Sequence, residues 1–176
     1  MARVKYLQRT DPEANSALFD RLERERKVPT ANIFRALANA PELLDQFLSY
    51  ANAIRAVSIS PKLRELAILT VGHCTDSEYE IAHHQSHAQK AGVSPEQLKS
   101  ITDFETSPHF NEEERAVMAL ALESTLKVNV SDATWKRVAT FMSERQLVEL
   151  VANVAWYNSG VRFMGALAIE LEDSYR

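Results

Sequence analysis

The feature that most constrains the fold of this chain is the regular return of helix-start signals along it. A short polar residue followed three positions later by Glu or Gln forms a capping box, because the two side chains satisfy otherwise unpaired backbone amides. Four such boxes occur, and proline after a helix-entry residue marks two further starts. The six signals are Thr10/Glu13, Ser94/Gln97, Asn111/Glu114, Ser143/Gln146, Ala40-Pro41 and Ser60-Pro61.

The apolar residues between these signals recur at helical spacing, and no long stretch alternates apolar and polar residues as a strand would. The chain has only 4 glycines and 6 prolines in 176 residues, which disfavours folds that need many tight turns. We therefore predict an all-α protein. The predicted helices are 11–25, 30–39, 41–56, 61–74, 77–91, 95–101, 111–126, 131–140 and 144–171.

The charge balance and the single cysteine limit the partners and the compartment. With 20 basic and 24 acidic residues, the chain lacks the positive field that nucleic acid requires. No apolar run approaches the roughly 20 residues of a membrane span, and no apolar segment of a secretory signal follows the basic start. Cys74 cannot form an intrachain disulfide and suits a reducing compartment. We expect a cytoplasmic protein without nucleic-acid or membrane partners.

The length and the lack of a low-complexity linker predict one continuous domain. A chain of 176 residues buries enough surface to fold without a disulfide or a structural metal. Within this domain we expect residues 1–58 to form a helical extension packed on a core of residues 59–176.

Helix 61–74 is apolar on every side after Arg64, except at Glu65. Gly72 lies two helical turns further on the same face, where it would let a neighbouring element approach closely. A buried carboxylate must be paired or have a raised pKa. The alternative is that Glu65 offsets the helix dipole, or pairs with Arg64 or Lys62 at the surface.

Helix 77–91 is predicted to turn Glu80, His84 and His87 toward the core or a cleft, where ordinary core design would place hydrophobic residues. Glu80 and His84 are four residues apart, and a carboxylate beside an imidazole fixes its tautomer and stabilises its charged form. Such a pair is typical of proton transfer. The alternative is that Glu80 completes a capping box with Ser77.

Metal and thiol chemistry find less support in the sequence. Glu80, His84 and His87 could in principle bind zinc or iron, but the HExxH pattern is absent, so we expect no metal and no cofactor. Cys74 ends an apolar helix, which favours a small buried hydrophobic residue over a nucleophile.

Several short segments share their order and spacing with one known family. They are Leu63–Leu69, Tyr79–His84 and Ala88–Ser94, with further similarity at Asn32–Ala38, Pro41–Leu44, Glu112–Val117 and Tyr157–Phe163. Together they resemble the carboxymuconolactone decarboxylase family, whose superfamily includes alkylhydroperoxidase D. The resemblance implies an AhpD-like helical bundle that assembles as trimers or hexamers, with a pocket built on Glu65 and His84.

In the redox branch of this superfamily, two cysteines precede the histidine by seven and four residues. Ser77 and Glu80 occupy these places here, which excludes a disulfide relay at this site. The chain is similar to the cysteine-free branch.

The leading functional hypothesis is a decarboxylase-like lyase acting on a small acidic ring compound such as a carboxylated lactone. His84 is the expected general acid or base, Glu80 would orient it, and Glu65 would be a second proton-transfer carboxylate. His87 and Arg162 are expected to bind the substrate. Two alternatives stay open. One is a redox protein that uses Cys74 or a metal, and the other is a non-catalytic helical assembly module.

The two-residue connection Thr75-Asp76 predicts that helices 61–74 and 77–91 are antiparallel neighbours. Glu65 would then lie near the far end of the second helix rather than beside His84. A contact between them would require a partner subunit or a bent crossing.

Overall fold

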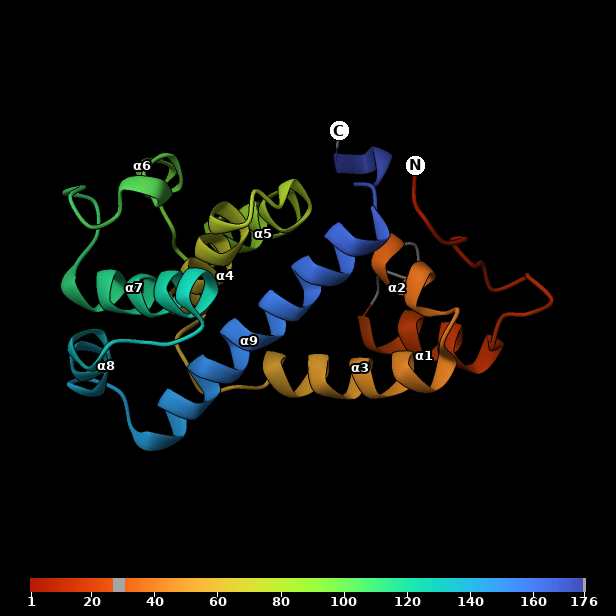
Figure 1. Cartoon of the computed structure of the whole chain (residues 1–176), viewed down its shortest axis with the longest axis horizontal. Coiled ribbons are helices and arrows are strands. Elements are labelled where there is room, and N and C mark those ends of the chain that lie inside the picture. The colour runs from red at the N-terminus through yellow and green to blue at the C-terminus, as the bar shows by residue number, and fades with distance from the viewer. Residues whose placement is uncertain (27–30, 176) are drawn as a thin grey trace. The chain divides into compact units, whose positions relative to one another are not determined.

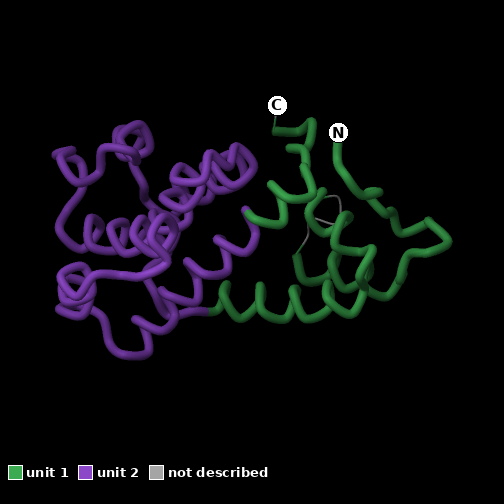
Figure 2. The backbone as a smooth tube through the Cα atoms, viewed as in Figure 1, with its two compact units in different colours: residues 1–56, 162–176 green, residues 57–161 purple. Residues whose placement is uncertain are grey.

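The computed structural model describes residues 1–26 and 31–175, and within these ranges every regular element is a helix (Figure 1). The predicted all-α class is therefore confirmed. The start of the predicted helix 30–39 lies outside the described residues. Two compact units divide the chain, as Figure 2 shows: unit 1 comprises residues 1–56 and 162–176, and unit 2 comprises residues 57–161. The sequence-based domain limits, 1–58 and 59–176, stay a prediction.

Unit 2 is organised around one buried helix. Its elements are α4 (Pro61–Cys74), α5 (Glu78–Lys90), α6 (Pro95–Lys99), the short 3-10 turn η1 (Ile101–Asp103), α7 (Glu112–Lys127), α8 (Asp132–Ala139) and the first part of α9 (Glu144–Leu167). Helix α4 packs against both α5 and α7, and α7 packs against α8 (Figure 1). Because neighbours cover α4 on more than one side, every residue from Glu65 to Gly72 is buried, as its apolar sequence predicts.

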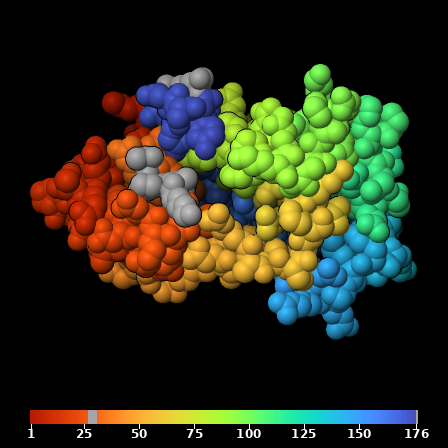
Figure 3. All heavy atoms as spheres, turned by 180° about the vertical axis from the view of Figure 1, so that it is seen from behind, coloured from red at the N-terminus to blue at the C-terminus, as the bar shows by residue number. Residues whose placement is uncertain are grey.

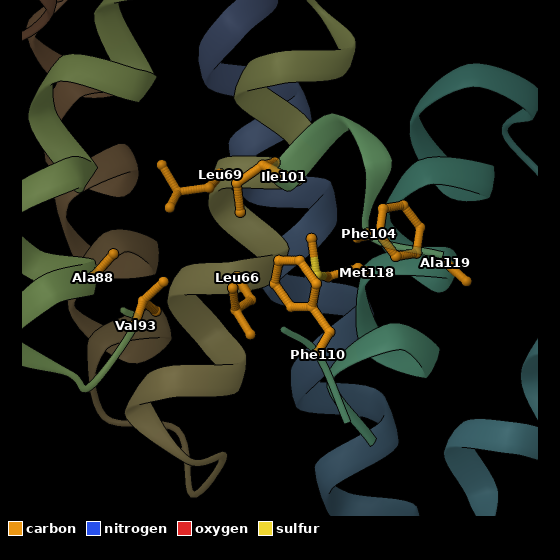
Figure 4. Packing of buried hydrophobic residues seen from close by; sticks show 9 residues of the cluster. All are labelled: Leu66, Leu69, Ala88, Val93, Ile101, Phe104, Phe110, Met118 and Ala119. Carbon is orange, nitrogen blue, oxygen red and sulfur yellow. The ribbon is translucent and has the colours of Figure 1, made fainter. Parts of the chain in front are cut away.

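The hydrophobic core beside α4 combines residues that are far apart in the sequence. Figure 4 shows this cluster: Leu66, Leu69, Ala88, Val93, Ile101, Phe104, Phe110, Met118 and Ala119. On another side of α4, a Cβ added at Gly72 would lie 3.2 Å from Cγ1 of Ile81. The predicted close approach of a neighbouring element at Gly72 is therefore confirmed, and this element is α5.

Unit 1 contains α1 (Ser16–Arg26), α2 (Asn32–Leu37), α3 (Pro41–Arg55), the end of α9 and the 3-10 turn η2 (Asp173–Tyr175). Helix α3 packs against α1 and α2. The rings of Phe47 and Phe163 meet edge to face at 5.9 Å, and the backbone amide of Arg3 donates to the carbonyl of Leu167 at 2.9 Å. In residues 1–26 and 31–175, no helix has the length and apolar character that crossing a membrane demands.

Three of the four predicted capping boxes form, at Ser94/Gln97, Asn111/Glu114 and Ser143/Gln146. The prediction of a capping box at Thr10/Glu13 is wrong. The Glu13 carboxylate instead accepts a hydrogen bond from Lys5 at 2.7 Å. Helix α1 begins later, after Asn15, whose side-chain oxygen accepts from the amide of Ala17 at 3.1 Å.

Several helix ends also differ from prediction, most of them by one or two residues. Helix α9 ends at Leu167 rather than at residue 171, because Ala168 has φ of +50° and cannot continue a right-handed helix. Helix α6 ends at Lys99, and η1 follows it.

Candidate active site

The imidazole of His84 lies between two carboxylates that come from different helices. Its Nδ1 is 2.8 Å from Oε2 of Glu65 on α4, and its Nε2 is 3.5 Å from Oε2 of Glu80, one turn earlier on α5. The exposed fractions of these side chains are 6% for Glu65, 10% for Glu80 and 15% for His84. The structure thus brings together all three predicted catalytic residues, within unit 2 of a single chain.

The expectation that Glu65 would lie too far along α5 to reach His84 is wrong. That expectation compared only backbone positions along two antiparallel helices. The structure shows that the two side chains bridge the remaining distance, and Gly72 lets α5 approach α4 closely. The contact needs no partner subunit.

The start of α5 explains why the Glu80 side chain is free to point inward. Ser77 caps the helix by accepting a hydrogen bond from the backbone amide of Glu80 at 3.4 Å. One half of the capping box that was the alternative role of Glu80 therefore forms, through the backbone amide of Glu80. Its side chain does not complete the box but is buried and contacts His84.

The pKa values of the two carboxylates are shifted in opposite directions. Burial alone would raise the pKa of Glu65, but the hydrogen bond with His84 and the nearby charges of His84, Arg64 and His87 outweigh it and lower that pKa. Burial raises the pKa of Glu80, and the charges of His84 and His83 offset it only in part. Burial and pairing therefore move the two pKa values apart, that of Glu65 downward and that of Glu80 upward, which is the separation that acid–base sites use.

Helix α9 contributes two residues to which sequence analysis gave no role. The ring of Tyr157 meets the ring of His84 edge to face, with centroids 4.9 Å apart. A Cβ added at Gly160 would lie 3.2 Å from Oε1 of Glu80, so the absence of a side chain at Gly160 leaves room for that carboxylate. Both lie in a segment that resembles the family, and their spacing of three residues places them on one helix face. That spacing was the available signal.

The two predicted substrate-binding residues are both exposed, but they belong to different units. His87 follows His84 by three residues on α5, and the two ring centroids are 5.8 Å apart. Arg162 belongs to unit 1, so its part in substrate binding stays a prediction. The neighbouring His83 is half-buried and stacks on Tyr79 with centroids 4.3 Å apart.

The described side chains give little support for metal binding or for thiol chemistry. Within the described part of the chain, no three His, Cys, Asp or Glu side chains are grouped as a metal would require. Cys74, at the end of α4, is half-buried rather than fully buried, and burial raises the pKa of its thiol. A thiol with a raised pKa is a weak nucleophile at neutral pH.

Comparison with solved structures identifies the fold. The chain is similar to the debrominase Bmp8, whose structures include a complex with 2,3,4-tribromopyrrole, at 23% identity, with a TM-score of 0.82, over 98% of this chain and 93% of that one. It is also similar to an uncharacterized peroxidase-related protein with an alkylhydroperoxidase AhpD core from Ralstonia eutropha, at 16% identity and a TM-score of 0.82, over 99% and 94% of the two chains.

The family model that matches the chain covers the centre of its sequence. Residues 41–123 match the model of the carboxymuconolactone decarboxylase family, and this range contains Glu65, Glu80, His84 and His87. No curated protein matches the chain. Residues 41–123 therefore carry the pattern of the carboxymuconolactone decarboxylase family on an AhpD-like helical fold, and the resemblance predicted from the sequence is confirmed.

Proposed function

We propose that this chain is an enzyme that transfers protons on a small acidic, unsaturated ring compound, as in the decarboxylation of a carboxylated lactone. One observation carries the proposal: an imidazole lies between two buried carboxylates whose pKa values are shifted in opposite directions. A site of this kind holds a proton on one side of the ring and a negative charge on the other.

The chemistry requires a group that delivers a proton to carbon. In decarboxylation the bond between the ring and its carboxylate breaks, carbon dioxide leaves, and the electron pair enters the ring as an extended enolate. The enolate then takes up one proton. A protonated Glu80 and the His84 imidazole are suited to supply that proton, because both lie in a largely water-excluded site.

The distances support a division of roles that reverses the one expected from the sequence. Glu65 makes the shorter contact with His84, so we assign it the task of fixing the ring and stabilising its charged form. Glu80 makes the longer contact and has the raised pKa, so we assign it the proton-donating role. Arg162 stays a proposed partner for the substrate carboxylate, and His87 is considered below.

The test is turnover of γ-carboxymuconolactone, followed by ultraviolet absorbance, with the parent protein and the His84→Ala variant. We expect the variant to lose activity by about 10³-fold or more, because general acid–base groups contribute factors of about 10² to 10⁴. His109→Ala, a change of an exposed loop histidine outside the cluster, is the control and should keep full activity. No turnover by the parent of this or related ring acids would contradict the proposal.

Folding and assembly must be measured beside activity. If His84→Ala unfolds, or if Glu80→Gln disrupts an oligomer while no ring acid is ever turned over, the cluster is structural, as in the non-catalytic assembly module. We also propose a trimer or hexamer, which sedimentation of the purified protein would establish. The redox alternative that uses Cys74 would require a reactive thiol, and the raised pKa of this thiol argues against it.

A further inference from the structure

His87 is an exposed imidazole beside the buried acid–base cluster. It lies one helical turn beyond His84 on α5, and the ring planes of the two residues are tilted by 58° with centroids 5.8 Å apart. Exposure therefore increases from Glu65 and Glu80 through His84 to His87. Figure 3 shows the yellow-green atoms of this part of the chain at the surface of unit 2.

The proposed reaction needs a supply of protons from solvent. Decarboxylation of a carboxylate anion consumes one proton per turnover, since carbon dioxide replaces that anion and a new carbon–hydrogen bond forms. Glu80 and His84 are 10% and 15% exposed, so their reprotonation depends on a route through neighbouring groups. A group on that route must gain and lose protons near neutral pH, which an imidazole does readily.

Other exposed side chains on the same stretch of α5 do not meet this requirement. Gln85, Ser86 and Gln89 are exposed but do not titrate. His83 is half-buried and stacks on Tyr79, a different contact from the one His87 makes with His84.

We infer that His87 shuttles protons between solvent and His84, and that each proton used by the reaction enters the site by this path. The inference rests on the proposed function and gives His87 a task other than substrate binding. His87 accepts a proton from water and passes it to His84, which restores the proton on Glu80. In this proposal one bridging water carries the proton across the gap between the rings.

The test compares His87→Gln with His109→Gln, a control at an exposed loop histidine outside the cluster. Activity is measured in dilute buffer and again with added imidazole, a small molecule that can carry protons in place of the missing ring. We expect His87→Gln to lower kcat by about 10-fold in dilute buffer with little change in KM, and imidazole to restore most of the loss. His109→Gln should keep the parent kcat in both conditions.

The outcomes separate the shuttle from the proposed function. If the parent turns over a ring acid but His87→Gln matches it in dilute buffer, the shuttle is wrong and the proposed function stands. A rise in KM alone would instead assign His87 to substrate binding, and a loss of kcat that imidazole does not restore would also overturn the shuttle. A parent without activity would overturn both.

Discussion

Unit 2 buries glutamate side chains at two places, around Glu114 and around Glu80. The two glutamates differ in the number and type of their hydrogen-bonding partners. Glu114, 5% exposed, accepts three contacts from donors: Lys62 at 2.6 Å, the Gln97 side chain at 3.0 Å and the Asn111 amide at 3.0 Å. For Glu80, 10% exposed, the described residues provide one polar partner, a ring nitrogen of His84 at 3.5 Å.

The difference in partners explains the difference in pKa. Burial would raise the pKa of Glu114, but its hydrogen bonds and the charge of Lys62 outweigh burial and lower it. For Glu80, burial dominates and the pKa is raised. A buried carboxylate with complete partners stabilises the fold, whereas one with an incomplete set keeps a proton that a reaction can use. The same substitution at both places tests this distinction.

Among substitutions at Glu80, Glu114 and Gly160, Glu80→Gln should have the largest effect on activity. We expect a loss of about 10²- to 10³-fold in kcat, because the amide cannot give up a proton to the substrate. The overall fold should survive, since the amide has the shape of the protonated acid that the site favours. Circular dichroism and kinetics on the same samples check both points, and full activity of the variant would remove Glu80 from the mechanism.

The stability of Glu80→Gln also has a predicted pH dependence. Because the folded pKa of Glu80 is raised above its usual value of 4.5, its contribution to stability is fully present below that pH and is lost as pH rises through the folded pKa. Glutamine has no such loss. Urea unfolding between pH 4 and pH 8 should show the variant gaining on the parent as pH rises, and the opposite trend would contradict the raised pKa.

Glu114→Gln should instead lower stability and leave kcat unchanged. All three partners of this carboxylate are donors, so the amide group of glutamine must face one of them. We expect a loss of about 1–2 kcal/mol in the free energy of unfolding at pH 7. Since the folded pKa of Glu114 is lowered, its contribution is present above about pH 4.5 and is lost as pH falls, so parent and variant should converge in acid.

Gly160→Ala should have the smallest effect and tests the space around Glu80. The new methyl group would lie 3.2 Å from Oε1 of Glu80, so the carboxylate must shift by a few tenths of an ångström. We expect a few-fold loss of kcat. Gly165→Ala on the same helix is the control, because no described atom lies within 4 Å of its added Cβ, and it should gain about 0.5–1 kcal/mol of stability. Equal kcat values for the two variants would show that Glu80 tolerates the shift.

Much of the helical framework could be predicted from short-range patterns. Helix α4 has the predicted bounds, and the boxes at Ser94 and Asn111 form as expected, because a cap depends on residues only three positions apart. The failure at Thr10 has a different origin. Lys5 competes for the Glu13 carboxylate, and a local capping pattern does not include that competitor.

The candidate site was predictable in its members but not in its geometry. Glu65, Glu80 and His84 stand out because polar residues interrupt faces that should be apolar, and that signal lies within single helices. Tyr157 and Gly160 carry no such signal, since an aromatic residue and a glycine are ordinary on a buried helix face.

By itself, the sequence determined which segments are helical, which faces turn inward and which acidic and basic side chains lie on those faces, because these depend on spacings of three and four residues. Only the tertiary structure decided that Glu65 reaches His84 across 19 positions, that α9 adds Tyr157 and Gly160, and that one carboxylate is better paired than the other. Those outcomes depend on how closely helices pack and how much water they exclude, and packing is a property of the whole fold.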